Sequence, residues 1–362
     1  MRSNMNLENF TDFKLPKNAY LSFDANSLKD LIIERLNENE IFTDQNFEGS
    51  NFSAFIDVVA YMYHVLLFYL NTTSNEGTLT TASIYENMSK LVSNIGYKPL
   101  GDQTSLLNID IQASNIPSDI YTIPRFSFIQ INSIVYNTLE DITFEKTQDN
   151  TTEALDINYD ILHQGTIKEA LFVSTGEKYE TVTLIDNFTS PQAVKSIDNV
   201  TGTKFISDNT FRVYVQNNVT NKWVEWEETA SLFLENPTNP KYEKVFNSSG
   251  NYDFKFGDGN NGKALEQGDR ILVFYIESDN AQGSLAGGAI NGSNFNLYSS
   301  KNYDDIKSQL YTEVNLVTPS VLPNITTSND YNSTTVKTAE TVDEIRENAP
   351  GIFSTQDRLV LK

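Results

Sequence analysis

The longest apolar stretch of this chain lies close to its amino terminus. A polar segment, Phe42–Asn51, opens directly onto Phe52–Leu70, where apolar side chains occupy almost every helical position. A helix that is apolar nearly all the way round cannot be covered by one small core on one side. The pattern therefore predicts a helix that several neighbours must cover.

Two further helices are expected beside it. Ser27–Asp30 resembles a capping box, and the apolar spacing that follows predicts a first helix ending near Asn39. A third helix is expected to begin around 81–83 and to end at Gly96, which is followed by Pro99. Together the three helices predict an arm over residues 1–100.

The apolar helix presents more hydrophobic surface than the arm can cover. One side makes an ordinary core stripe, and Ile56, Ala60, Leu67, Phe68 and Leu70 on the other side would face water if only the two neighbouring helices covered this one. Exposed apolar patches of that size usually mark an interface, so we favour packing between chains over a purely internal core. The predicted interface residues are Phe55, Val58, Val59, Met62, Val65, Leu66 and Tyr69.

From Ser105 to about Ser278 the hydrophobic period changes to two, with frequent turn signals, which is typical of antiparallel strands. The clearest predicted strands are Leu106–Ile111, Ser127–Ile131, Ser133–Tyr136, Thr181–Leu184, Phe211–Val215, Asn251–Phe256 and Arg270–Ile276. The polar segment Asn187–Lys204 could separate two β domains. Thr341 and Glu344 predict a second capping box before a short helix, Val342–Asn348.

These patterns predict an α+β fold with an amino-terminal helical bundle arm followed by antiparallel β-rich domains. We expect the arm over residues 1–100, β domains over 101–190 and 191–290, and an irregular tail over 291–362.

Composition narrows the range of functions. A net charge of −22 and a pI near 4.4, with no Lys/Arg cluster, argue against nucleic-acid partners. The absence of cysteine excludes disulfides, thiolate zinc sites and thiol nucleophiles. Phe52–Leu70 has about the length of a membrane span, but it carries Asp57 and His64 and lacks flanking Lys/Arg, so no membrane partner is expected. The amino terminus has no secretion signal, which predicts synthesis in the cytoplasm.

The sequence Phe256-Gly-Asp-Gly-Asn-Asn-Gly-Lys263 resembles a phosphate-binding loop. Such loops need a following helix, whereas a strand is predicted here, and Ala264 stands where the Ser/Thr hydroxyl is required. We interpret Gly257, Asp258, Gly259 and Gly262 as a structural turn that needs positive φ angles. A structural cation held by Asp253, Asp258, Asn260 and Asp269 remains an alternative, although their spacing does not match the twelve-residue calcium loop.

No catalytic motif emerges. His64 and His163 have no paired ligand at metal spacing, and the chain contains neither a nucleophile elbow nor a His-Glu-x-x-His motif. The sequence predicts no enzyme activity, no catalytic residue, no cofactor and no metal site.

Four places along the chain carry a resemblance to a known family. They are Phe47–Asn51 with Asp57–Tyr61, Asn71, Glu76 and Thr80–Ala82; Gly96–Pro99 with Tyr121–Arg125; Phe256–Gly259 with Gly262, Gly268, Asp269 and Tyr275; and Val342–Pro350 with Thr355–Arg358. In this order they resemble the large inner-ring baseplate wedge protein of T-even-type contractile-tailed phages, and more broadly the baseplate J-like family. Proteins similar to this one usually continue beyond the fourth place, so the chain is expected to be a short version or a truncated one.

The resemblance implies a structural protein of the virion, made and assembled in the host cytoplasm. Its implied partners are a second copy of itself, other baseplate wedge subunits through a helical bundle, neighbouring wedges in the ring around the tail tube, and a sheath-initiator type protein. Such a ring relays the contraction signal to the sheath. Tailocins and cellular injection systems share these modules.

Two other functions stay open. A receptor- or glycan-binding tail protein would need exposed aromatic platforms, whereas Trp223 and Trp226 are expected on opposite faces of one strand. A cell-wall hydrolase is the third alternative.

Overall fold

The computed structural model describes residues 29–30, 32–34, 51–93, 95–155, 161–185, 204–247, 249–318, 320, 322 and 324–349. The chain divides into two compact units, Met1–Leu91 and Val92–Lys362. Several predictions fall outside the described residues: the capping box at 27–28, the polar turn before Asn51, most of the 187–204 boundary, and the Thr355–Arg358 motif.

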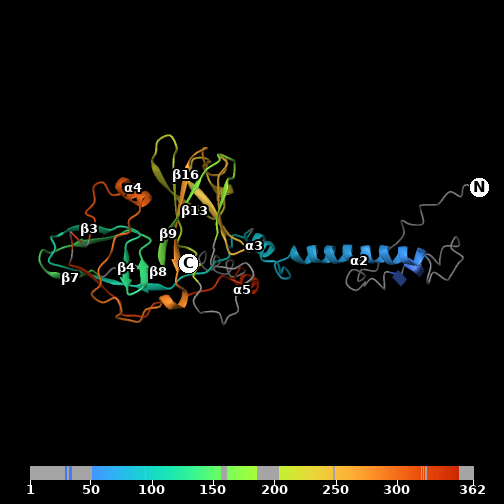
Figure 1. The fold of residues 1–362 in the computed structure, drawn as a ribbon, viewed down its shortest axis with the longest axis horizontal. Coiled ribbons are helices and arrows are strands. Elements are labelled where there is room, and N and C mark those ends of the chain that lie inside the picture. Colours follow the sequence, from blue (N-terminus) through green and yellow to red (C-terminus); the bar gives the residue numbers. More distant parts are fainter. Residues whose placement is uncertain are drawn as a thin grey trace, which may run out of the picture. The chain divides into compact units, whose positions relative to one another are not determined.

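The first unit contains one long helix, α2, which runs from Asn51 to Glu76. Figure 1 draws it as a single uninterrupted coil. It is longer than predicted by about two turns at its carboxyl end. The short helix α3, Tyr85–Ser93, follows after a tight turn.

The second unit contains two groups of strands, here called the first and second β modules. The first module has three small sheets, with strand orders β1-β8-β5-β4, β17-β2-β7 and β3-β6. Their bounds are β1 Leu106–Asn108, β2 Asp110–Ser114, β3 Asp119–Ile123, β4 Phe128–Ile131, β5 Ile134–Asn137, β6 Ile142–Lys146, β7 Thr152–Leu155, β8 Ile161–Gln164 and β17 Ile325–Ser328. Alternating side chains of these strands form one core, which includes Ile111, Ile123 and Leu162.

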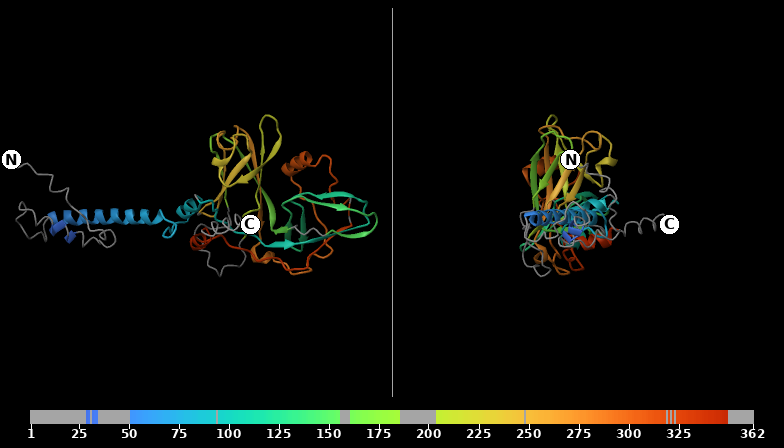
Figure 2. Two further views of the ribbon diagram at one scale, coloured as in Figure 1. Left: turned by 180° about the vertical axis from the view of Figure 1, so that it is seen from behind. Right: turned by 90° about the vertical axis from the view of Figure 1, so that its right-hand side faces the viewer.

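The second β module is an eight-stranded sheet of order β10-β15-β14-β13-β12-β16-β11, in which β9 also pairs with β16. Its strands are β9 Thr166–Val173, β10 Thr181–Leu184, β11 Phe205–Ile206, β12 Arg212–Gln216, β13 Trp223–Thr229, β14 Lys241–Phe246, β15 Tyr252–Phe256 and β16 Arg270–Ser278. Of the pairings in this sheet, only β13–β14 is parallel. Figure 2 shows the same sheet from two further sides.

A third core joins the two modules. Phe126 of the first module packs against Phe274 of β16, with ring centroids 4.7 Å apart. Helix α4, Lys301–Leu310, adds Tyr303 and Ile306 to this core. The remaining elements are α5, Val342–Asn348, and two short 3-10 helices, η3 Leu232–Leu234 and η4 Asn280–Gly283.

The predicted fold class is wrong in its amino-terminal helical bundle arm. The structure is mostly β-sheet, with 33% strand against 23% helix, and its described residues contain no helical bundle arm. Local periodicity correctly located a helix at α2, but it could not show whether the chain itself supplies helices to pack around it. The antiparallel β-rich region is present, and β10 and α5 have the predicted bounds.

Candidate functional site

The surface of α2 is the most exposed apolar feature of the described residues. Large apolar side chains that are between 52% and 64% exposed occur along most of the helix: Phe55, Val58, Tyr61, Met62, Tyr63, Leu66, Phe68, Tyr69 and Leu70. Monomeric proteins rarely leave such side chains exposed in one contiguous patch. The helix therefore has the composition of a binding surface.

Five of the predicted interface residues, Phe55, Val58, Met62, Leu66 and Tyr69, belong to this exposed set, while Val59 and Val65 are half-buried. Phe55, Met62 and Tyr69 recur every seven residues, with the other four between them. Side chains at this spacing fall on one stripe of a helix and can pack against a second helix.

The expectation that Ile56 and Ala60 would face water is wrong. They are 2% and 1% exposed, respectively. Beside them, Asp57 forms an ion pair of 2.7 Å with Lys29, one of the helical residues 29–30 and 32–34. The side of α2 that carries Ile56 and Ala60 is thus covered, whereas five of the seven predicted interface residues are exposed.

By length and hydropathy α2 also meets the requirements for a membrane-spanning helix. Ser53–Glu76 has a mean hydropathy of 1.6 over its most apolar window, of which 11% is buried. Charged Asp57 and polar His64 and Asn71 recur every seven residues on one side, which is unfavourable in a lipid environment.

The turn after α2 is held by Glu76. Its carboxylate accepts hydrogen bonds from the backbone N–H groups of Ser83 (2.9 Å) and Ile84 (3.1 Å) and from the Ser83 hydroxyl (2.6 Å). These bonds lower the pKa of Glu76 to about 2, with the Ser83 hydroxyl contributing most. Glu76 thereby holds the turn that leads into α3.

Two of the family-like motifs meet in the second unit although they lie far apart in the sequence. The Tyr97 hydroxyl donates to Glu340, whose other carboxylate oxygen accepts the Leu100 N–H at 3.0 Å. Asn348, at the end of α5, donates to Glu340 at 2.9 Å. The predicted capping box of α5 is confirmed, with Thr341 and Glu344 bonding reciprocally. Residues 97–100 are therefore fastened to the segment that leads into α5.

The predicted structural turn closes on itself. The carboxylate of Asp258 accepts the N–H groups of Asn260 (2.9 Å) and Asn261 (2.8 Å), which lower its pKa. A Cβ on Gly257 would lie 2.4 Å from the Gly262 backbone, and Gly262 itself has φ of +73°. No helix follows the glycines, so the loop lacks the helix terminus that a phosphate site needs.

This turn also supports an exposed apolar pair that the sequence reading missed. The Gly262 N–H donates to the Glu235 carbonyl, at the end of η3. Leu232 is buried there, whereas Phe233 and Leu234 are 71% and 82% exposed. The only signal in the sequence was the apolar triplet between polar residues.

The carboxylates that the sequence offered as an alternative cation site bind different partners within the chain. Asp253 accepts from Thr183 of the neighbouring strand β10, whereas Asp269 accepts the Asn218 N–H, so these carboxylates hold different parts of the sheet. Among the described residues no cluster of three His, Asp or Glu could hold a metal. Trp223 and Trp226 lie in different cores and are 8% and 3% exposed, which leaves neither as a glycan platform.

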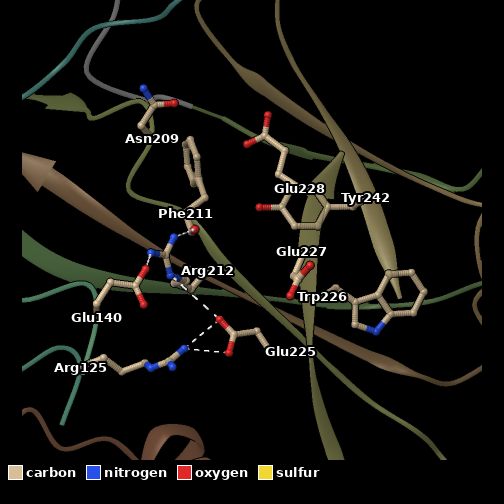
Figure 3. A pocket seen from close by; sticks show the side chains of 10 residues that line it. All are labelled: Arg125, Glu140, Asn209, Phe211, Arg212, Glu225, Trp226, Glu227, Glu228 and Tyr242. Atoms are coloured by element: carbon tan, nitrogen blue, oxygen red, sulfur yellow. Dashed lines mark hydrogen bonds and ion pairs between the residues drawn. The ribbon is translucent and has the colours of Figure 1, made fainter. Parts of the chain in front are cut away.

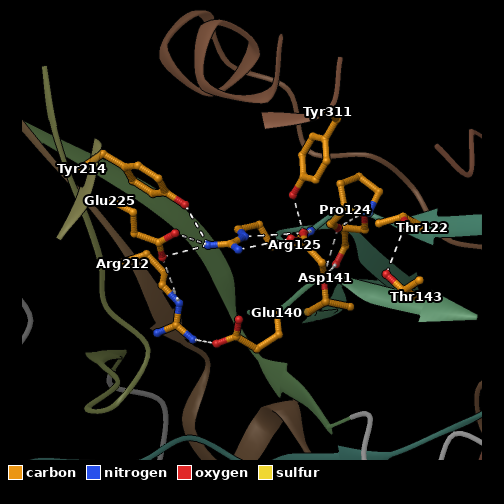
Figure 4. A network of polar contacts seen from close by, with 12 residues as sticks. Thr122, Pro124, Arg125, Glu140, Asp141, Thr143, Arg212, Tyr214, Glu225 and Tyr311 are labelled. Atoms are coloured by element: carbon orange, nitrogen blue, oxygen red, sulfur yellow. Dashed lines mark hydrogen bonds and ion pairs between the residues drawn. The ribbon is translucent and has the colours of Figure 1, made fainter. Parts of the chain in front are cut away.

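A charged network spans the two β modules (Figure 4). Arg125, after β3, lies 2.7 Å from Glu225 of β13 and 3.0 Å from the Tyr214 hydroxyl of β12. Its other nitrogen lies 3.1 Å from Asp141 of the first module. Burial acts to raise the pKa of Asp141, but hydrogen bonds from Arg125 and Tyr311 hold it below the usual value.

An open groove lies beside this network, with a volume of about 510 Å³. Its lining residues are Arg125, Glu140, Asn209, Phe211, Arg212, Glu225, Trp226, Glu227, Glu228 and Tyr242 (Figure 3). The groove exists because β13 pairs with β12 only as far as Trp226 and then with β14 from Glu227 onward. The sequence reading did not identify it, although the run Glu225-Trp-Glu-Glu228 was a signal.

Two comparisons with known proteins identify no relative of this chain. No protein-family model matches the chain, and no curated protein matches it either.

Proposed function

We propose that this chain is a structural subunit of a contractile-tail baseplate, which joins other wedge subunits and a second copy of itself through the exposed surface of α2. The observation that carries the proposal is the exposure of Phe55, Met62, Leu66 and Tyr69 on one stripe of a long helix. Burying such side chains between chains would stabilise an assembly by roughly 1.5–3 kcal/mol for each residue.

The residues that resemble the inner-ring wedge family have structural roles in this chain. Glu76 holds the turn before α3, Tyr97 is bonded through Glu340 to the segment before α5, and Asp258 closes a turn. Residues that hold a framework rigid suit a protein that transmits movement within an assembly. We further propose that the chain lies in the virion baseplate and that it helps to relay the contraction signal to the sheath.

The test is the double variant Met62→Asp, Leu66→Asp in the full-length chain. Co-expressed with the other wedge proteins of the same tail, it should lose co-purification by at least tenfold, because two carboxylates would be desolvated in the interface. Native mass spectrometry of the eluted complexes reports both partner and copy number.

The matched control is Val219→Asp, Tyr331→Asp, which places two charges on apolar side chains that are each 78% exposed in the second unit. This control should assemble normally. Unimpaired assembly of the α2 variant would contradict the proposal, as would retention of the wild-type chain in the membrane fraction of cells that contain no partner.

The alternative of a receptor- or glycan-binding tail protein has less support. Its aromatic platform would have to come from tyrosines, because both tryptophans are buried. Binding of the wild-type chain to a glycan array would favour that function.

A further inference from the structure

The second β module holds a buried amine directly beside a buried carboxyl group. Lys244 of β14 forms an ion pair with Asp208, which lies between β11 and β12, and the two side chains are 7% and 1% exposed. Glu228 of β13 lies 3.5 Å from the same Lys244 nitrogen. An amine, a carboxyl group and a second carboxylate thus meet at one point from three separate segments of the chain.

The surroundings of this pair are aromatic and closed to solvent. The ring of Phe211, which is 4% exposed, has its centroid 5.3 Å from the Lys244 nitrogen. Tyr252, which is 1% exposed, packs on Phe211 with ring centroids 4.7 Å apart. Charges are costly in such a place, so transfer of one proton from the ammonium group to the carboxylate is less unfavourable there than in water. That transfer gives a neutral amine and a carboxylic acid, which are the species that react to form an amide.

The two oxygens of the Asp208 carboxyl group are held differently. Oδ2 accepts the Gly101 N–H at 2.7 Å, whereas Oδ1 accepts the Asn209 N–H at 2.9 Å and a proton of the Lys244 ammonium group. A backbone N–H aimed at a carboxyl oxygen stabilises the negative charge that this oxygen acquires when a nucleophile adds to the carbon. The Gly101 N–H is therefore placed as an oxyanion donor to Oδ2, and Oδ1 is the oxygen placed to leave.

We infer that Lys244 and Asp208 join in an internal isopeptide bond, with Glu228 as the group that carries the proton. The lone pair of Nζ adds to the Cγ carbon of Asp208, Glu228 takes the proton that the nitrogen loses, and this proton passes to Oδ1. The Cγ–Oδ1 bond then breaks, and Oδ1 leaves as water. One C–N bond replaces one C–O bond, and the products are a neutral amide and one water molecule, so no oxidant or further reactant is needed.

The bond would link parts of the sheet that are not neighbours. Asp208 precedes β12 and Lys244 lies in β14, and β13 separates these two strands in the sheet. A covalent link between them closes a loop of the chain and lowers the entropy of the unfolded state, so it stabilises the fold. Chains that have not yet reacted keep the ion pair. The inference does not depend on the baseplate role.

Mass spectrometry of the intact full-length chain is the primary test. We expect the wild-type protein to be lighter than its sequence by one water molecule, in a fraction that grows on incubation. A modified Lys244 resists trypsin, so digestion should yield one branched peptide that joins residues 205–212 to residues 242–255. This peptide is sought in the wild-type chain, so the test does not require any variant to fold. Lys244→Arg and Asp208→Ala should show the full mass and no branched peptide.

The role of Glu228 is tested by the rate at which the lighter species appears. Glu228→Gln should slow bond formation by at least about 100-fold, which is typical for loss of a proton-transferring group. Glu227→Gln changes the adjacent carboxylate, whose side chain is 72% exposed, and serves as the matched control that should leave the rate unchanged. Equal rates in these two variants would overturn the role of Glu228.

Three results would overturn the bond itself. The first is a wild-type mass that stays at the sequence value after prolonged incubation. The second is loss of ammonia in place of water, which would assign the bond to Asn209, whose Oδ1 lies 3.4 Å from the Lys244 nitrogen. The third is a loss of water that maps to another site, such as ring closure at Asp258–Gly259.

Discussion

On α2, Met62 and Leu66 are each 63% exposed, whereas in the second β module even a lysine side chain, Lys244, is only 7% exposed. The first region leaves apolar side chains uncovered, and the second encloses charged ones with their partners. Lys244 pairs there with Asp208, which also accepts the Gly101 N–H at 2.7 Å.

This difference indicates where each region obtains its stability. The second module pairs buried charges such as Lys244 and Asp208 within its own chain. A long helix gains most of its stability from packing of its apolar face, so α2 depends on whatever covers it. Ion pairs in the two regions should therefore differ in energetic weight, although their chemistry is the same.

The largest expected effect is that of Lys244→Met. Removing this ammonium group leaves the Asp208 carboxylate buried without a counter-ion, which should lower the free energy of unfolding by about 3–5 kcal/mol. Chemical denaturation followed by tryptophan fluorescence measures the change, because both tryptophans lie in this module. The double variant with Asp208→Asn should recover part of the loss, since no lone charge remains. A loss below about 1 kcal/mol for the single variant would remove the contrast between the regions.

A smaller effect is expected from His163 on lowering the pH. Burial, together with the charge of Arg212, lowers the pKa of His163 from 6.5 to about 4. An unfolded chain therefore takes up a proton near pH 6.5, while the folded chain does so only near pH 4. The stabilising contribution is complete above pH 6.5 and is lost as the pH falls toward 4. We expect a decrease of about 1–2 kcal/mol, since the ring is half-buried and partly screened.

Titration of unfolding free energy between pH 7 and pH 4 tests this expectation. His163→Gln should flatten the curve over that range, and an unchanged slope would show that other groups control it. The comparison Tyr331→Phe, at an exposed site, should keep the wild-type slope.

The smallest effect is expected for Lys29→Met in the first unit. The Lys29–Asp57 pair is partly exposed on both sides, with side-chain exposures of 33% and 53%. Surface pairs typically contribute about 0–1 kcal/mol, so helicity measured by circular dichroism should barely change. A loss comparable to that of Lys244→Met would contradict the contrast drawn between the two regions.

Much of the β region could be predicted because its signals are local. The alternation in Thr181–Leu184 gave β10 directly, and the Thr341/Glu344 pair gave α5 with its capping box. The pairing of β9 with β16, by contrast, joins residues about 100 positions apart, and no local pattern specifies it. The helical bundle was predicted wrongly for the same reason: periodicity describes one helix and not its neighbours.

The candidate site shows the same limit. The turn at Gly257–Gly262 was predictable, because glycine and Asp-Gly steps carry their own backbone preference. The groove was not, because it depends on β13 leaving β12 for β14 after Trp226.

By itself, the sequence determined the long apolar helix, the positions of several strands and the tight turns, since each follows from side-chain spacing or backbone preference over a few residues. Tertiary structure alone decided which face of α2 is covered, which charges meet inside the second unit, and where a groove opens. Those outcomes depend on contacts between distant residues, whose energies do not appear in any local pattern.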